Sequence, residues 1–172
     1  MAFNNTKHYY PSQGRQKFLE TFSDQTIADL SCRNPVSYAV ACARAKDFRA
    51  VVVISGGQIS GCAGGNDPIA YMGIHGISDG TLNIAGGRSM RDKFVKNNGC
   101  AQTNAAEPSK GSGVHVKTEY KGCTTGYPVT WIAHDGGHWP GAVDHGPESG
   151  AKSWVPGEIW SFFTQAQLSS KS

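Results

Sequence analysis

Residues 48–56 read FRAVVVISG, and this stretch decides the fold class. It is almost entirely apolar, is rich in β-branched valine, and ends in small residues. Such a run is typical of a strand that is buried on both faces of a sheet, because polar residues alternate only where one face meets water. A second run of this kind, IAYMGIHG, follows at residues 69–76. We therefore expect a sheet that is covered on both faces.

The segments around these two runs alternate between helical and strand patterns. Helices are expected at 36–46, 84–98 and 156–168, and further strands at 114–120 and 128–136. Segment 114–120 alternates as a half-exposed strand does, whereas segment 128–136 is apolar. Strands that alternate with helices indicate an α/β fold with a mainly parallel sheet.

The N-terminal part of the chain shows a weaker pattern. Residues 1–17 are polar, and we expect them to form a disordered or irregular tail. Residues 18–30 have a composition compatible with a helix. Because no repeat or second domain is visible, residues 18–172 are expected to form one α/β domain.

Composition argues against several classes of protein. The chain has 172 residues, of which 38% are hydrophobic and 17% charged, as in an ordinary globular protein. The net charge of +3 is small and scattered, so we expect no nucleic-acid partner. No apolar stretch approaches the ~20 residues of a membrane span. The N-terminus lacks the apolar core of a signal peptide.

The five cysteines point to a disulfide rather than to a metal site. None forms a CxxC pair, which argues against zinc and thioredoxin-like sites. Cys100 and Cys123 both follow turn-like residues and bracket one loop, as a disulfide would. The odd number means that either one thiol is free or a partner cysteine lies outside this chain.

Asp79 and His138 each follow a strand of the expected sheet. Because the carboxyl ends of parallel strands meet at one edge, both residues are expected on the same rim. In serine hydrolases an acid fixes the tautomer of a histidine, which carries the serine proton. The alternative is structural, with Asp79 capping a turn and His138 acting as a polar loop residue.

Other polar residues near this rim have less specific patterns. HDGGH at 134–138, together with Asp144 and His145, suits zinc only on a helix, and its glycines argue against a helix. His75 is within reach of the rim, but we expect backbone groups to satisfy it. Trp139, beside His138, is the tryptophan best placed to meet a substrate.

The glycine-rich stretch SGGQISGCAGGND at 55–67 is a further candidate for ligand binding. It lacks the Lys-Ser/Thr ending of a phosphate loop and the spacing of a dinucleotide site. We interpret it as a turn or a lid.

Four longer segments occur in an order typical of one family. They read SYAVACARAKDFRAVVVISGGQISGC, GNDPIAYMGIHGISDGTLNIAGGRSMRDKFVKNNGC, GYPVTWIAHDGGH and PGEIWSFF. Together they resemble the C-terminal half of the fungal feruloyl esterases, which are carbohydrate esterases related to acetylxylan esterases and polyhydroxybutyrate depolymerases. The resemblance covers about residues 36–168.

The resemblance implies an α/β-hydrolase fold, extracellular location, and hydrolysis of ferulate esters on plant cell-wall arabinoxylan. By position, Asp79 matches the acid of the family's catalytic triad and His138 its base. No metal or organic cofactor is implied. The family's nucleophilic serine lies in a Gly-x-Ser-x-Gly turn just before the segment that matches SYAVACARA.

At that place this chain reads DLSCRNPVSYAV, residues 29–40. Ser31 falls at the distance of the nucleophile, but Asp29 and Arg33 replace the two glycines. The serine turn is strained, and bulky neighbours clash in it. Either Ser31 is the nucleophile of an altered turn, or the turn has been deleted.

The part before Ser31 is also too short for the first strands of such a fold, so the resemblance predicts an N-terminally truncated domain. We expect a feruloyl esterase-like serine ester hydrolase with impaired activity. One alternative is a non-catalytic protein that at most binds cell-wall polysaccharide. A further alternative is a secreted binding module held by disulfides.

Overall fold

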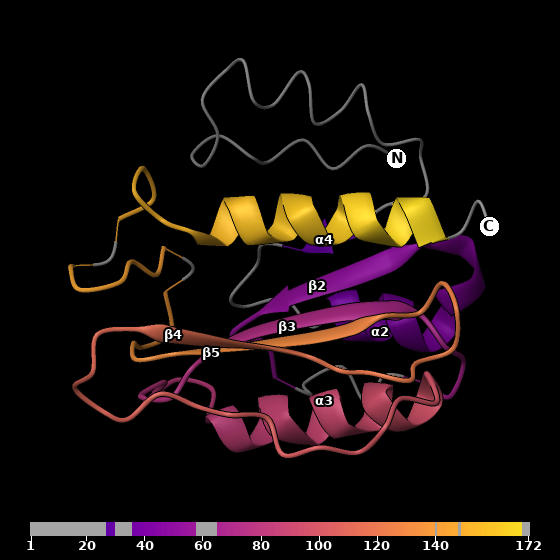
Figure 1. Ribbon diagram of the computed structural model, residues 1–172, viewed down its shortest axis with the longest axis horizontal. Coiled ribbons are helices and arrows are strands. Elements are labelled where there is room, and N and C mark those ends of the chain that lie inside the picture. The colour runs from indigo at the N-terminus through magenta and orange to yellow at the C-terminus, as the bar shows by residue number, and fades with distance from the viewer. Residues whose placement is uncertain (1–26, 30–35, 58–64, 140, 148, 170–172) are drawn as a thin grey trace.

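The computed structural model describes residues 27–29, 36–57, 65–139, 141–147 and 149–169. Within these residues, helices stand between groups of one or two strands along the chain (Figure 1). The strands are β1 Ile27–Asp29, β2 Ala50–Ile54, β3 Ala70–Gly76, β4 His115–Glu119 and β5 Val129–His134. The helices are α2 Val36–Ala43, α3 Ile84–Asn97 and α4 Val155–Ser169, with a short 3-10 helix, η1, at Ala45–Asp47.

The five strands form one sheet in the order β1-β2-β3-β5-β4. Strands β1, β2, β3 and β5 are parallel to their neighbours, whereas β4 runs antiparallel to β5 at the edge. The expected α/β fold with a mainly parallel sheet is confirmed. The half-exposed pattern of 114–120 predicted a strand there, and its five residues are either partly buried or exposed. That pattern did not predict the direction of the strand.

Strand β2 is buried on both faces of the sheet, as the apolar run at 48–56 predicts. Val51 and Val53 face a cluster that includes Phe94 of α3, whereas Val52 and Ile54 face a cluster that includes Phe162 of α4. Figure 1 shows α4 above the sheet and α3 below it. Because successive side chains of a strand point to opposite faces, two helix layers are needed to cover such a strand.

Helix α3 is fixed at both ends. At its start, the side chain of Asn83 accepts a hydrogen bond from the amide of Ala85 at 2.9 Å. At its end, Gly99 has a φ of 68°, a left-handed conformation that favours glycine. The buried side chain of Asn98 donates to the carbonyl oxygens of Ile69 at 2.7 Å and Tyr127 at 3.0 Å. The helix end is therefore tied to the segments that lead into β3 and β5.

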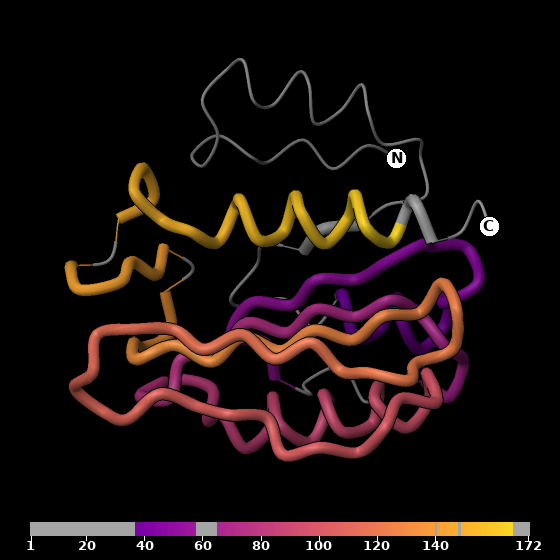
Figure 2. Tube along the Cα trace, viewed as in Figure 1, coloured from indigo at the N-terminus to yellow at the C-terminus, as the bar shows by residue number. Residues whose placement is uncertain are grey.

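The segment after α3 returns along the helix toward β4, as the tube in Figure 2 shows. Arg88 of α3 holds it through two hydrogen bonds to Glu107, at 2.8 and 2.5 Å. A disulfide joins Cys100 to Cys123, which confirms the pairing expected from their turn contexts. Cys42 is also disulfide-bonded.

One expectation for the N-terminal part is wrong where it is tested. Ile27–Asp29, assigned above to a helical segment, form a strand that pairs in parallel with Val51–Val53. The gain from extending the sheet beside β2 outweighs local helix propensity, which is a weak predictor for short segments. The tail expected at 1–17 and residue Ser31 lie outside the described residues.

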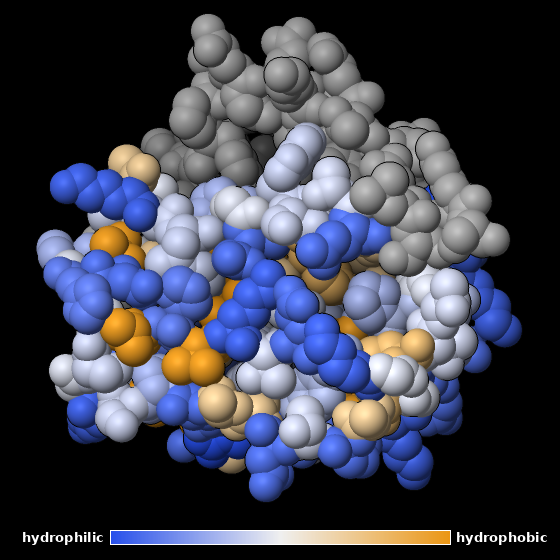
Figure 3. Space-filling model, viewed as in Figure 1, coloured by the Kyte–Doolittle hydropathy of each residue, from blue (hydrophilic) through white to orange (hydrophobic). Residues whose placement is uncertain are grey.

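The face shown in Figure 3 is largely hydrophilic, with hydrophobic residues in small separate patches. Among the described residues, Trp139 is the one large hydrophobic side chain that is exposed, at 66%. None of the helices in this part of the chain combines the length and apolarity needed to cross a membrane.

Candidate active site

The ends of β3 and β5 lie together at the carboxyl edge of the sheet. Gly76, the last residue of β3, pairs in register with His134, the last residue of β5. Beyond them, the amide of Ile77 donates to the carbonyl of His134 at 2.9 Å, and that of Ser78 to the carbonyl of Gly136 at 3.0 Å. The loops that follow the two strands therefore start side by side.

The close approach of these loops requires glycine at position 76. A Cβ atom added there would overlap the carbonyl oxygens of Gly136 and Gly137. Real Cβ atoms do not come so close to a backbone oxygen, so any larger residue would force the loops apart. The glycine-rich sequences around the two loops thus have a direct geometric reason.

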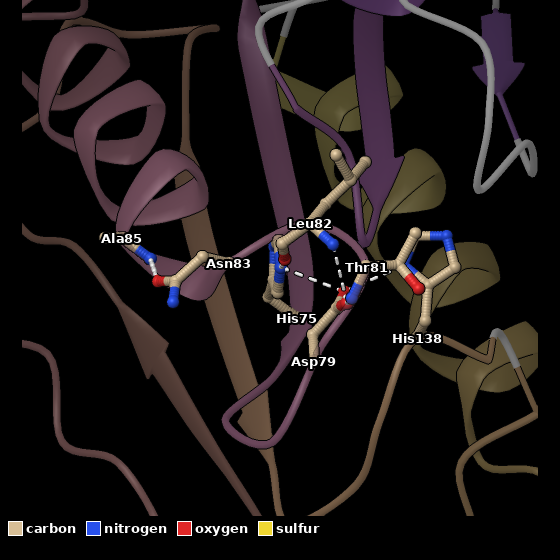
Figure 4. Close-up of polar contacts among 7 residues, drawn as sticks. All are labelled: His75, Asp79, Thr81, Leu82, Asn83, Ala85 and His138. Carbon is tan, nitrogen blue, oxygen red and sulfur yellow. Dashed lines mark hydrogen bonds and ion pairs between the residues drawn. The ribbon is translucent and has the colours of Figure 1, made fainter.

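These loops bring Asp79 and His138 together. The Nδ1 atom of His138 lies 2.8 Å from Oδ2 of Asp79 (Figure 4). The side chain of Asp79 is fully buried, and that of His138 is 18% exposed. The contact agrees with the expectation that residues following neighbouring parallel strands meet at one rim. The catalytic roles of the two residues stay predictions.

The carboxylate of Asp79 receives further hydrogen bonds from its own turn. Its Oδ1 atom accepts from the amides of Thr81 and Leu82, both at 2.8 Å. Burial alone raises the pKa of the Asp79 carboxyl, but the hydrogen bonds from His138, Leu82 and Thr81 outweigh it and lower the pKa below its ordinary value. Asp79 is therefore ionised at neutral pH and acts only as an acceptor.

An ionised Asp79 fixes the tautomer of His138. Because the carboxylate can only accept, Nδ1 of His138 must carry the proton in this contact. A neutral imidazole then presents Nε2 as its basic nitrogen. A histidine held in this way can take a proton from a hydroxyl and return it to a leaving group.

A second histidine lies on the other side of Asp79 (Figure 4). Nε2 of His75 is 2.8 Å from the carbonyl oxygen of Leu82 and 3.3 Å from Oδ2 of Asp79. The expected backbone partner is confirmed, but the proximity to Asp79 was not predicted. The only sign of this proximity in the sequence is that His75 and Asp79 are four residues apart across the end of β3. Burial lowers the pKa of His75 and keeps the ring neutral.

The residues of the alternative metal site have separate partners. His134 is buried in β5 and lies edge-on to Trp154, with ring centroids 6.1 Å apart. Asp144 contacts Nδ1 of His115 at 2.9 Å, and Asp135 accepts from the amide of Gly113 at 2.7 Å. In the described part of the chain, no group of three or more His, Cys, Asp or Glu residues is arranged to hold a metal ion.

Two other expectations concern neighbours of the site. Trp139, next to His138, is largely exposed, so its indole is accessible at this rim. Of the glycine-rich stretch 55–67, residues 58–64 lie outside the described residues, as does Ser31. The interpretation of that stretch as a turn or lid stays a prediction.

The chain is similar to several fungal proteins, although no family model matches it. Feruloyl esterase C of Emericella nidulans is 52% identical over 131 residues, which are 76% of this chain and 46% of that protein. Feruloyl esterase D of Neurospora crassa is 47% identical over 155 residues, 86% of this chain and 52% of that protein. The probable feruloyl esterase C of Aspergillus niger is 49% identical over 161 residues, 87% of this chain and 57% of that protein.

The chain thus spans about half the length of the curated relatives it matches. The matched part is nonetheless long, and it covers 76% to 87% of this chain. Over the region that it shares with them, the chain belongs to the family of the fungal feruloyl esterases.

Proposed function

We propose that the chain is a feruloyl esterase-like ester hydrolase of the α/β-hydrolase type, with Asp79 and His138 as acid and base of a serine triad. The observation that carries this proposal is the 2.8 Å contact between the two side chains at the carboxyl edge of the sheet. The names of the relatives support an ester as the substrate.

In the proposed reaction, a serine hydroxyl attacks the carbonyl carbon of the ester while Nε2 of His138 takes its proton. The tetrahedral intermediate collapses, and His138 returns the proton to the departing alcohol. Water then attacks the acyl-enzyme by the same route, which releases ferulate and restores the serine. Throughout, Asp79 keeps Nδ1–H of His138 in place and stabilises the imidazolium.

The nucleophile is the weak element of this triad. Ser31 is the candidate by position, but Asp29 and Arg33 stand where the family's turn has glycines. Forcing such residues into a strained turn costs ~1–3 kcal/mol each. Loss of the nucleophile lowers turnover by about a million-fold in a model protease. We therefore propose that hydrolysis by this chain is strongly impaired.

The proposed substrates are ferulate esters of plant cell-wall arabinoxylan outside the cell. Disulfides at Cys42 and between Cys100 and Cys123 support an oxidising compartment, since such bonds are rare in the cytosol. The exposed indole of Trp139 is suited to contact an aromatic acyl group or a sugar ring beside His138.

Hydrolysis of methyl ferulate by the purified chain tests the impairment. We expect no turnover above buffer from the unaltered chain or from a control variant at an exposed serine, Ser109→Ala. Robust turnover that Ser31→Ala abolishes would overturn the impairment and identify the nucleophile. If His138→Ala abolishes turnover and Ser31→Ala leaves it intact, the result would support His138 as the base and exclude Ser31 as the nucleophile.

The second candidate function is non-catalytic binding of cell-wall polysaccharide, which the residues around Ser31 favour. Calorimetry with a feruloylated arabinoxylan oligosaccharide, and with the same oligosaccharide after its ferulate is removed, separates the two. A site built for the ester should prefer the feruloylated form. Equal binding of both forms supports a polysaccharide-binding protein, and binding of neither contradicts the proposed substrate class.

A further inference from the structure

We propose that His75 is a positioning residue that holds the carboxylate of Asp79 in the orientation that His138 requires. This inference rests on the proposed function, because it assigns a role within the same acid–histidine pair. It adds a third side chain, from strand β3, to a pair built from two loops.

The proton of His75 is located by its contacts. Nε2 lies 2.8 Å from the carbonyl oxygen of Leu82, and a carbonyl oxygen only accepts, so this nitrogen carries the proton. The same nitrogen lies 3.3 Å from Oδ2 of Asp79. This N–H, whose hydrogen bond goes to Leu82, therefore also lies near the oxygen that receives the proton of His138 (Figure 4).

His75 also acts on the second oxygen of Asp79 through Leu82. The carbonyl of Leu82 accepts from His75, and its amide donates to Oδ1 of Asp79 at 2.8 Å. The imidazole of His75 thus contacts Oδ2 of Asp79 directly, and it also anchors Leu82, whose amide binds Oδ1. Rotation of the carboxylate would break both contacts.

The ring of His75 has little freedom to move. Its side chain is only 2% exposed, and it packs beside the indole of Trp131, with ring centroids 6.2 Å apart. Helix α3 passes so close that a Cβ atom added to Gly87 would lie 2.5 Å from Nδ1 of His75. A rigid, buried ring whose N–H is fixed on Leu82 can support the carboxylate on the side away from His138.

The test is a spectroscopic measurement on the folded chain, with nitrogen-15 NMR of the His138 ring. In the unaltered chain we expect the Nδ1–H tautomer and a low-field Nδ1 proton. His75→Leu, which removes the donor, should shift that proton upfield or abolish its signal. His75→Gln, whose amide can donate to the carbonyl of Leu82, should restore most of it.

Helix α3 offers a matched pair of variants that leave His75 itself in place. Gly87→Ala places its methyl group against the His75 ring, whereas Gly86→Ala points into open space. Both replace glycine by alanine within the helix, so their local propensity effects are alike. Gly87→Ala should alter the His138 signals, and Gly86→Ala should leave them unchanged.

The outcomes separate this inference from the proposed function. A folded His75→Leu variant with unchanged His138 signals would overturn the positioning role. If His75→Leu does not fold, unchanged signals in Gly87→Ala would overturn it in the same way. If the chain fails to bind feruloylated oligosaccharide while the NMR responses appear, the substrate proposal fails and the positioning role stands.

Discussion

Nδ1 of His138 lies 2.8 Å from Oδ2 of Asp79, although 59 positions separate the two residues. The contact arises because β3 and β5 are neighbours and end in register, so that the loops after them leave the sheet together. The backbone arrangement thus accounts for the orientation of His138, which the proposed triad requires. The effect of this contact on the tautomer of His138 can be measured on the folded chain, and the measurement does not require that the chain hydrolyse a substrate.

Asp79→Asn should move the proton of His138 from Nδ1 to Nε2. The asparagine oxygen can still accept from Thr81 and Leu82, which places its NH2 group toward His138 in the place of Oδ2. A donor there forces Nδ1 of His138 to accept. Nitrogen-15 NMR distinguishes the two tautomers, and loss of the charged acceptor should lower the free energy of unfolding by roughly 1–3 kcal/mol.

The control for that change is Asp67→Asn, at an exposed aspartate whose contact with Lys46 spans 3.7 Å. It should leave the tautomer of His138 unchanged and should alter the free energy of unfolding by less than about 0.5 kcal/mol. An Asp79→Asn variant in which His138 keeps its Nδ1 proton would contradict the orienting role of Asp79.

Gly76→Ala should break the contact between Asp79 and His138. The added methyl group would overlap the carbonyl oxygens of the loop after β5, and the strain can be relieved only by parting the loops. Loss of the His138 Nδ1 proton signal is the expected result. Gly80→Ala is the matched control, because its Cβ meets nothing within 4 Å. If the Gly76→Ala variant shows the same His138 Nδ1 proton signal as the Gly80→Ala variant, the prediction is contradicted, because the loops then accommodate the methyl group without losing the contact.

The sequence predicted the parts of the fold that depend on long apolar runs. Strands β2, β3 and β5 are buried on both faces, and such burial leaves an unbroken apolar pattern. The rim position of Asp79 and His138 followed from strand order alone. The pairing of β1 with β2 and the antiparallel direction of β4 depend on tertiary contacts, which no local pattern encodes.

The contact of His75 with Asp79 escaped prediction for a different reason. His75 lies within an apolar strand, where a histidine most often pairs with the backbone, as this one does with Leu82. Its second contact depends on the turn at Asp79–Leu82 folding back over the strand end. That turn is set by hydrogen bonds to the Asp79 carboxylate, which are visible only in the structure.

Stability should fall as the pH drops below about 6.5 because of His134 and His75. Burial lowers the pKa of His134 from 6.5 to about 4, and burial also lowers the pKa of His75. Between these values the unfolded chain binds more protons than the folded chain, so stability rises with pH in this window. The expected loss from His134 between pH 6.5 and 4 is roughly 3 kcal/mol.

Urea denaturation at a series of pH values measures this loss. His134→Leu should make the dependence on pH shallower, because the titrating group is gone. His145→Asn is the control at an exposed histidine with a φ of 54°, a conformation that asparagine tolerates. An unfolding free energy that stays constant from pH 7 to pH 4.5 would contradict the prediction.

Removal of the disulfide between Cys100 and Cys123 should destabilise the chain without disturbing the site. The bond spans 23 residues and joins the region after α3 to the segment before β5, at the end of the sheet away from His138. Chain entropy predicts a loss of roughly 3 kcal/mol for a loop of this length. The double variant Cys100→Ser, Cys123→Ser should therefore unfold at lower urea while its His138 NMR signals persist. Altered signals in the folded variant would show that the site depends on the bond.

Trp139→Ala should weaken binding of a feruloylated oligosaccharide by roughly fivefold, which corresponds to about 1 kcal/mol for one aromatic contact. The reason is the position of the indole, which is 66% exposed directly beside His138. Trp139→Phe keeps an aromatic ring and should recover part of the affinity. Calorimetry on the three proteins measures the difference, and circular dichroism checks that each is folded. Because an exposed side chain contributes little to stability, a change in affinity without a change in unfolding would assign Trp139 to ligand contact. Equal affinities for all three proteins would remove it from the proposed substrate site.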